Sequence, residues 1–261
     1  MARSDHCPGC TAWTSRQRQP LRDVLESRCP FPQLATRFSV SRGEHVYHQG
    51  DRVRGGFSIA KGIVALERVD ADGVLVILKV LQPGAFFPCS NLLDDSLYET
   101  SARALTDVSG CFVPAERLNS ALHRDPDIAL ALLRLSSAEI RENEDTIFRL
   151  HSTDLPNRVL ATLAALADEM GGQEANGDLT LTLPMSWRDM AAMVGTGPEV
   201  ISRLLRRLSD AGRLSFSGRN VILHAVLIHG GKGDVKDAAF PRNRVHPKPA
   251  AVVLGNLLAD G

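Results

Sequence analysis

The segment 185–212 carries side chains whose types and spacing could read the edges of nucleic-acid bases. At helical spacing after Pro198, one face is apolar and consists of Val200, Ile201, Leu204, Leu205 and Leu208. The opposite face carries Glu199, Ser202, Arg203 and Arg206. Arginine matches guanine O6 and N7, glutamate accepts from the cytosine amino group, and serine bonds to either base edge. We therefore predict a helix that lies in the major groove of double-stranded DNA.

The residues before this helix have the signals of a shorter helix and a tight turn. Ser186 is a predicted N-cap, and Asp189 three residues later completes a capping box. Gly195 and Gly197 permit the turn, and Pro198 suits the first position of the new helix. The alternative is an ordinary charged surface helix, but the preceding helix and turn favour a helix-turn-helix.

After Gly212, the residues 213–223 alternate in polarity around Ser217-Gly218, which predicts a β-hairpin, or wing. The whole chain has zero formal net charge, with 30 basic and 30 acidic residues. The segment itself is locally basic through Arg203, Arg206, Arg207, Arg213 and Arg219. Local charge governs attraction to phosphate, so Arg207 and Arg219 join the predicted DNA-binding residues.

Composition excludes several classes of protein. No apolar run approaches the length of a membrane span, and the polar N-terminus is not a signal peptide, so we expect a cytoplasmic protein without a membrane partner. Five cysteines in a reducing compartment are expected to be metal ligands or buried thiols rather than disulfides. The sequence has no pattern that pairs a nucleophile with a base, and no paired carboxylates, so we do not expect an enzyme.

Two further elements precede the helix-turn-helix. Short apolar runs punctuated by glycines from Phe38 to Val113, with a tight turn at Asp70–Gly73, predict an antiparallel β-barrel or roll. Residues 126–151 lack glycine and have an apolar seam at heptad spacing, which predicts a long helix that pairs with its own copy. The seam residues are Leu133, Ser136, Ile140, Asn143, Ile147 and Leu150.

This order of parts resembles the CRP/FNR family of transcription regulators over nearly the whole chain, to about Leu227. The motifs that carry the resemblance are Ser41-Arg-Gly-Glu44, His48-Gln-Gly-Asp51, Leu81-Gln-Pro-Gly-Ala-Phe86 and Glu199-Val-Ile-Ser-Arg203. The last motif matches the FNR form of the recognition helix, because the CRP form has an arginine where Pro198 stands. The resemblance implies a homodimer that binds TTGAT half-sites in the arrangement TTGAT-N4-ATCAA and contacts RNA polymerase.

The resemblance implies an α+β fold with a cyclic-nucleotide-binding-like antiparallel β-roll, a long dimerisation helix and a C-terminal winged helix-turn-helix. The expected domains are an N-terminal cysteine-bearing arm (1–30), a sensory β-roll (31–125), the dimerisation helix (126–153) and the DNA-binding domain (154–228). A tail (229–261) rich in Gly, Pro and basic residues is expected to be disordered. Within the DNA-binding domain, a helix over 159–170 and a loop over 171–177 are expected to precede the helix-turn-helix.

The cyclic-nucleotide members hold the phosphate with an Arg-Ser pair and a nearby Glu. Here Glu99-Thr-Ser101 stands where the Arg-Ser pair is expected, and Arg103 is only nearby. A phosphate site needs a cation and amides facing the anion. We therefore do not expect cAMP to be the ligand.

The resemblance instead assigns Cys7, Cys10, Cys29 and Cys111 as ligands of a [4Fe-4S] cluster that senses oxygen or a redox signal. Four thiolates satisfy such a cluster. The spacing from Cys10 to Cys29 is longer than in the enteric FNR pattern, but the added loop-closure cost is only about 1 kcal/mol. The alternatives are buried thiols at Cys29 and Cys111 and a zinc or redox pair at Cys7 and Cys10. Cys89 is expected in the core.

Haem is the alternative cofactor, sensing NO or CO. Its candidate ligands are His45, His48 and His123. No surrounding pattern marks a haem pocket, and regulation without a cofactor is a further alternative.

Overall fold

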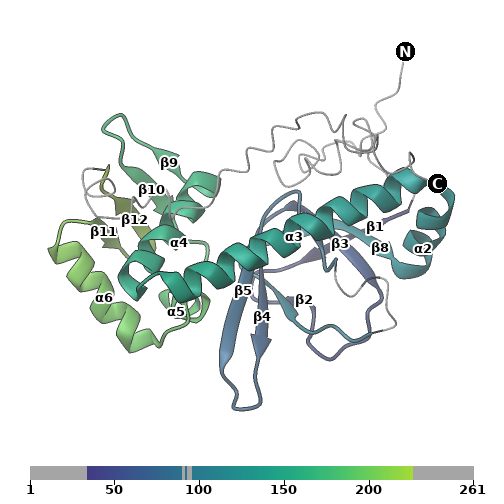
Figure 1. Ribbon diagram of the computed structural model, residues 1–261, viewed down its shortest axis with the longest axis horizontal. Coiled ribbons are helices and arrows are strands. Elements are labelled where there is room, and N and C mark those ends of the chain that lie inside the picture. The colour runs from purple at the N-terminus through teal and green to yellow at the C-terminus, as the bar shows by residue number, and fades with distance from the viewer. Residues whose placement is uncertain (1–33, 90–91, 93–95, 226–261) are drawn as a thin grey trace, which may run out of the picture.

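The computed structural model describes residues 34–89, 92 and 96–225, and Figure 1 shows two parts bridged by one long helix. The first part contains β1 (Thr36–Val40), β2 (His45–Tyr47), β3 (Gly55–Lys61), β4 (Val64–Val69), β5 (Leu75–Leu81), β6 (Phe86–Phe87), β7 (Ser101–Ala104) and β8 (Val108–Pro114). The helices are α2 (Ala115–Arg124), α3 (Pro126–Ser152), α4 (Leu155–Met170), α5 (Trp187–Val194) and α6 (Pro198–Asp210). The second part also contains β9 (Gly172–Gln173), β10 (Leu179–Thr182), β11 (Leu214–Ser217) and β12 (Asn220–Leu223).

The first part is an antiparallel β-roll of two four-stranded sheets, ordered β1-β8-β3-β6 and β2-β7-β4-β5. Apolar side chains from both sheets, such as Ile59, Val64 and Phe87, form one buried cluster between them. The predicted turn after β4 is present, because the Asp70 carboxylate accepts hydrogen bonds from the amides of Asp72 and Val74. The predicted α+β class and antiparallel roll are confirmed.

Two helices leave the roll in succession. The sequence pattern does not predict the ten-residue α2, which follows directly on the last strand of the roll. Asp125 then caps α3 by accepting from the amide of Asp127 at 3.1 Å, which starts a new helix directly after α2. Only the first turns of α3 enter the core of the roll, where Ala131 and Leu132 are buried.

The second part departs from expectation in two places. Helix α4 begins at Leu155 rather than at Val159, because the Asp154 carboxylate accepts from the amide of Asn157 at 3.0 Å and fixes an earlier N-terminus. The predicted loop over 171–177 contains β9, which pairs with β10 as a hairpin. This hairpin joins the wing in a sheet ordered β11-β12-β10-β9.

The β-roll and the second part share one apolar core. Ala65, Ile77, Val80 and Leu105 of the roll belong to the same buried cluster as Leu163 of α4, Met190 of α5 and Ile201 of α6. Burying apolar surface stabilises by about 25 cal/mol for each Å² removed from water. The helix-turn-helix is therefore packed on the roll of its own chain and not merely tethered by α3.

Candidate nucleic-acid interface

The helix-turn-helix is built as its sequence predicts. Ser186 Oγ accepts from the Asp189 amide at 3.1 Å, and the Asp189 carboxylate accepts from the Ser186 amide at 3.0 Å, which completes the capping box of α5. Gly195 ends α5 with a φ of 72°, a left-handed conformation that glycine adopts without the penalty of a Cβ atom. Pro198 occupies the first turn of α6. These local signals fix the angle between the two helices.

The two faces of α6 separate as predicted. Ile201, Leu204, Leu205 and Leu208 are buried, whereas the polar residues of the predicted reading face are exposed. We call Glu199, Ser202, Arg203 and Arg206 the reading face, and the adjacent Arg207 is exposed as well. Ser202 Oγ donates to the Pro198 carbonyl at 2.9 Å. Among the residues that the structure describes, no ion pair engages the three arginines, so their guanidinium groups are available to a ligand.

The wing is fixed to the start of α5. Trp187 donates its indole N–H to the Gly218 carbonyl at 2.8 Å, and its ring meets that of Phe216 edge to face with centroids 5.8 Å apart. Arg219 follows at the exposed tip. The arrangement presents a basic hairpin beside a basic helix, which suits a phosphate backbone on either side of a groove.

Of the four predicted cluster cysteines, Cys111 alone lies in the described part of the chain. It is half-buried on β8, and its register partners are Arg37 on β1 and Ser58 on β3. Cys7, Cys10 and Cys29 lie outside the described residues, as do the predicted arm (1–30) and tail (229–261). Within the described ranges, no group of three or more His, Cys, Asp or Glu side chains could hold a metal ion.

Cys89 and the candidate haem ligands have ordinary surroundings. Cys89 is buried and donates to the Phe86 carbonyl at 3.4 Å, as expected of a core thiol. The rings of His45 and His48 lie together with centroids 4.4 Å apart, and His45 contacts Glu67. His123 lies on α2, where its Nδ1 is 2.8 Å from the Asn119 carbonyl oxygen.

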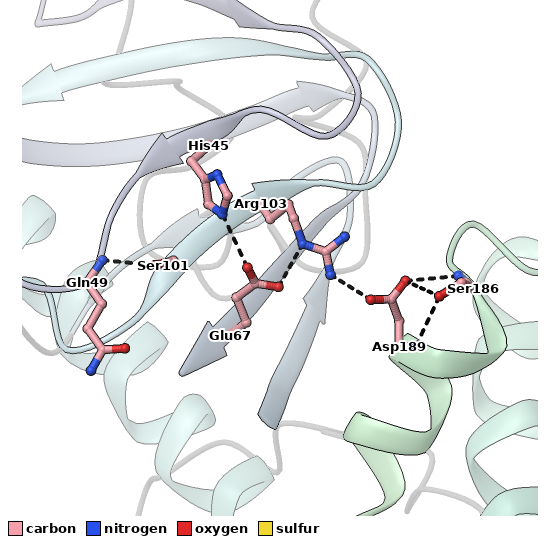
Figure 2. Close-up of polar contacts among 7 residues, drawn as sticks. All are labelled: His45, Gln49, Glu67, Ser101, Arg103, Ser186 and Asp189. Atoms are coloured by element: carbon pink, nitrogen blue, oxygen red, sulfur yellow. Dashed lines mark hydrogen bonds and ion pairs between the residues drawn. The ribbon is translucent and has the colours of Figure 1, made fainter. Parts of the chain in front are cut away.

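Arg103 has partners that the sequence does not reveal. Figure 2 shows that its guanidinium lies between two carboxylates, with Nε 2.8 Å from Glu67 Oε2 and Nη2 2.7 Å from Asp189 Oδ1. Burial alone would lower the pKa of Arg103, but the hydrogen bonds to both carboxylates raise it. Burial alone would raise the pKa of Asp189, yet the hydrogen bonds from Ser186 and Arg103 lower it below 3.8. Both groups are therefore held in their charged forms.

The predicted dimer seam is exposed in the single chain. Leu133, Ile140 and Ile147 are 65, 58 and 57% exposed, and Asn143 and Leu150 are also exposed. Phe148, which the heptad spacing does not include, is 72% exposed on the same helix. Figure 1 shows that α3 runs across the molecule from the β-roll to the second part.

Comparisons with known proteins agree with both parts of the chain. Residues 37–125 match the model of the cyclic nucleotide-binding domain, and residues 157–226 match that of the Crp-like helix-turn-helix domain. A CRP-like cAMP-activated global transcriptional regulator of Mycobacterium tuberculosis is 27% identical, over 70% of this chain and 81% of that protein. The transcriptional activator protein FnrA of Stutzerimonas stutzeri is 26% identical, over 76% and 81%. The structure of FixK2 from Bradyrhizobium japonicum superposes with a TM-score of 0.62 at 28% identity, covering 72% and 92%.

A β-roll, a long helix and a winged helix-turn-helix in this order define a two-part, DNA-binding regulator. With both domain matches, the chain belongs to the CRP/FNR family of transcription regulators. The family is one of DNA-binding regulators rather than enzymes. No helix within the described residues is long and apolar enough to cross a bilayer.

Proposed function

We propose that this protein is an FNR-type transcription regulator that binds TTGAT-N4-ATCAA-like sites as a homodimer under the control of oxygen or redox state. The observation that carries this proposal is the exposed reading face of α6, whose residue types match base edges and whose arginines are available. The name of the relative FnrA is consistent with it, although other regulators are equally similar.

Base specificity in this proposal comes from the N-terminal half of α6. Arg203 makes a bidentate contact with guanine, Glu199 accepts from a cytosine amino group, and Ser202 bonds to a neighbouring edge. Pro198 stands where the CRP form has an arginine, so a contact that favours TGTGA is missing. Arg206 lies on the same base-reading face, whereas Arg207 and Arg219 bind phosphates and supply affinity rather than specificity.

Dimerisation uses the exposed seam of α3. Leu133, Ile140 and Ile147 recur at heptad spacing and have no cover in the single chain. A dimer joined along α3 has two copies of α6, one for each half-site. A two-fold DNA site requires these copies to lie about one helical turn of DNA apart. RNA polymerase is the further partner that this role implies, in the cytoplasm.

The proposed sensor is a [4Fe-4S] cluster held by Cys7, Cys10, Cys29 and Cys111. Four thiolates are the donor set that such a cluster prefers, and the cluster supplies chemistry that responds to oxygen. Arg37 of β1 lies opposite Cys111, and Cys29 precedes Thr36, where β1 begins, by seven residues. Seven residues span at most about 25 Å, so the length of chain between Cys29 and β1 permits Cys29 to reach Cys111.

Two observations argue against cAMP as the signal. Glu99-Thr-Ser101 replaces the Arg-Ser pair of the nucleotide-binding members. Arg103, the nearest cation in the sequence, is already engaged by Glu67 and Asp189. Freeing it for a phosphate would leave two partly buried carboxylates without their partner, which is costly.

The test is anaerobic purification followed by absorption spectroscopy, iron and sulfide assays, and binding to TTGAT-N4-ATCAA before and after exposure to air. The proposal predicts a brown protein that bleaches in air and loses affinity for the site. A sharp Soret band would instead support a haem sensor using His45, His48 or His123. A colourless protein that binds equally in air would contradict redox control.

A further inference from the structure

Arg103 forms one ion pair within the β-roll and a second that joins the roll to the helix-turn-helix. It lies on β7 of the roll, its Nε donates to Glu67 on β4, and its Nη2 donates to Asp189 on α5 (Figure 2). Arg103 and Asp189 are 86 residues apart in the chain. We call Glu67, Arg103 and Asp189 the interdomain bridge.

Each carboxylate of the interdomain bridge is held from a second side. Glu67 also contacts His45 Nε2 at 3.2 Å, and Asp189 accepts from both the amide and the hydroxyl of Ser186. The side chains of Glu67, Arg103 and Asp189 are only 8, 21 and 15% exposed. Charge-assisted hydrogen bonds of this length are directional, and low exposure protects them from screening by salt. The bridge is therefore preorganised.

The bridge lies beside the apolar contact between the two parts of the chain. Ala65 of β4 and Ile77 of β5 are buried in the same cluster as Met190 and Val194 of α5. The hydrophobic effect is non-directional, whereas a charge-assisted hydrogen bond has a preferred geometry that sets a position. Asp189 is also the residue that completes the capping box of α5, so the bridge holds the end of this helix.

The reading face is exposed while the bridge is closed. The bridge therefore does not cover α6, and its effect on DNA binding must come through orientation. Ile201 and Leu204 of α6 share a core with Met190 of α5, so fixing α5 also fixes α6. We infer that Arg103 is a positioning residue that sets the orientation of the reading face on the β-roll and thereby the spacing between half-sites that the dimer accepts. This inference rests on the proposed reading of DNA by α6.

The inference separates two properties of DNA binding. The sequence of one half-site is read by side chains of α6, whereas the distance between half-sites is set by how each α6 is held in the dimer. Loosening the bridge should relax the selectivity for spacing and leave the base preference unchanged. A residue with a merely structural role would alter stability or overall affinity without this separation.

The experiment first selects the preferred two-fold site of the full-length wild type from random-sequence DNA, so it does not presuppose TTGAT. Binding is then measured to that site and to versions with one or two base pairs added between the half-sites. The test variants are Arg103→Met and Asp189→Asn. The amide oxygen of the introduced asparagine keeps an acceptor for Ser186, so α5 retains its cap while the ion pair is lost. Arg68→Ala, an exposed arginine on neighbouring β4, is the matched control.

The wild type should bind the native spacing more tightly than the altered spacings. In both test variants, we expect this ratio of affinities to be roughly tenfold smaller than in the wild type. Their preference between half-site sequences should stay that of the wild type, and Arg68→Ala should behave as the wild type in both respects. Unchanged spacing selectivity in folded Asp189→Asn would overturn the inference. Tighter binding by both test variants would also overturn it, because the bridge would then restrain an inactive form. A wild type that selects no two-fold site would instead refute the proposed function.

Discussion

Trp187 donates its indole N–H to the carbonyl oxygen of Gly218 at 2.8 Å, so the first residue of α5 holds the turn of the wing. Gly218 lies in the exposed turn between β11 and β12. Its φ of 60° is a left-handed conformation that favours glycine at this position. The contact ties the wing, with Arg219 beside Gly218, to the first helix of the helix-turn-helix.

Trp187→Phe tests this link. Phenylalanine preserves an aromatic contact with Phe216 but removes the donor, so about 1 kcal/mol of stability should be lost. DNA affinity should fall to a similar extent for every sequence, because the proposed role of Arg219 in the wing is to contact phosphates. Urea unfolding and binding to specific and nonspecific duplexes measure the two effects. A change in base preference would contradict the assignment of the wing.

Arg203→Ala and Arg207→Ala should have different effects on DNA binding. Losing the bidentate contact of Arg203 should cost roughly 1–3 kcal/mol on TTGAT sites and relax base discrimination. Losing Arg207 should weaken binding to all sequences alike and reduce the salt dependence by about one phosphate contact. Titrations at several salt concentrations separate the cases. Equal losses of discrimination in both variants would show that the reading face is assigned wrongly.

Serine substitutions distinguish cluster ligands from core thiols. Cys7→Ser, Cys10→Ser, Cys29→Ser and Cys111→Ser each remove a thiolate and should prevent cluster assembly. The Cys89→Ser variant should keep the iron content of the wild type. The substitution places a hydroxyl in an apolar cluster, so it should lower the stability of the fold. Iron and sulfide are assayed after anaerobic reconstitution. Full iron retention in Cys29→Ser would remove this residue from the proposed site.

The dimer seam should be marginal without the cluster. Polar Ser136 and Asn143 interrupt it, and an acidic run of Glu139, Glu142, Glu144 and Asp145 would approach its own copy across the two-fold axis. The structure moderates this repulsion in one place, because Lys79 of β5 forms an ion pair with Glu142.

Asn143→Leu should therefore extend the apolar seam and yield a dimer that binds TTGAT-N4-ATCAA even in air. Sedimentation of the air-exposed wild type and variant measures the change, with Arg141→Leu as an off-seam control on the same helix. A cluster-free wild type that is already a tight dimer would refute this idea, and the switch would then act by reorienting the DNA-binding parts.

The DNA-binding elements could be predicted because their signals are local. Ser186, Gly195 and Pro198 mark helix ends within a few residues of the structure they determine, and the two faces of α6 follow from helical spacing alone. Helix α2 could not be separated from its surroundings because it is short and directly precedes α3. The β9–β10 hairpin gives little signal because β9 has only two residues.

The interdomain bridge could not be found from the sequence. In the sequence, Arg103 is only a cation near the place where the nucleotide-binding members hold a phosphate, and nothing local indicates a partner 86 residues away. Its contacts depend on how β4, β7 and α5 meet in three dimensions, which hydrophobic patterning does not specify. The cysteines pose the opposite problem, because their spacing suggests a cluster while three of them lie outside the described residues.

Competition binding by the anaerobic wild type tests the central claim most directly. The protein is bound to a labelled TTGAT-N4-ATCAA duplex and challenged with unlabelled duplexes that carry either TTGAT or TGTGA half-sites. With Pro198 in place of an arginine, and Glu199 and Arg203 reading bases, the TTGAT competitor should displace the label at a concentration roughly tenfold lower or more, about 1.4 kcal/mol. Equal displacement by both competitors, or stronger displacement by TGTGA, would contradict the account.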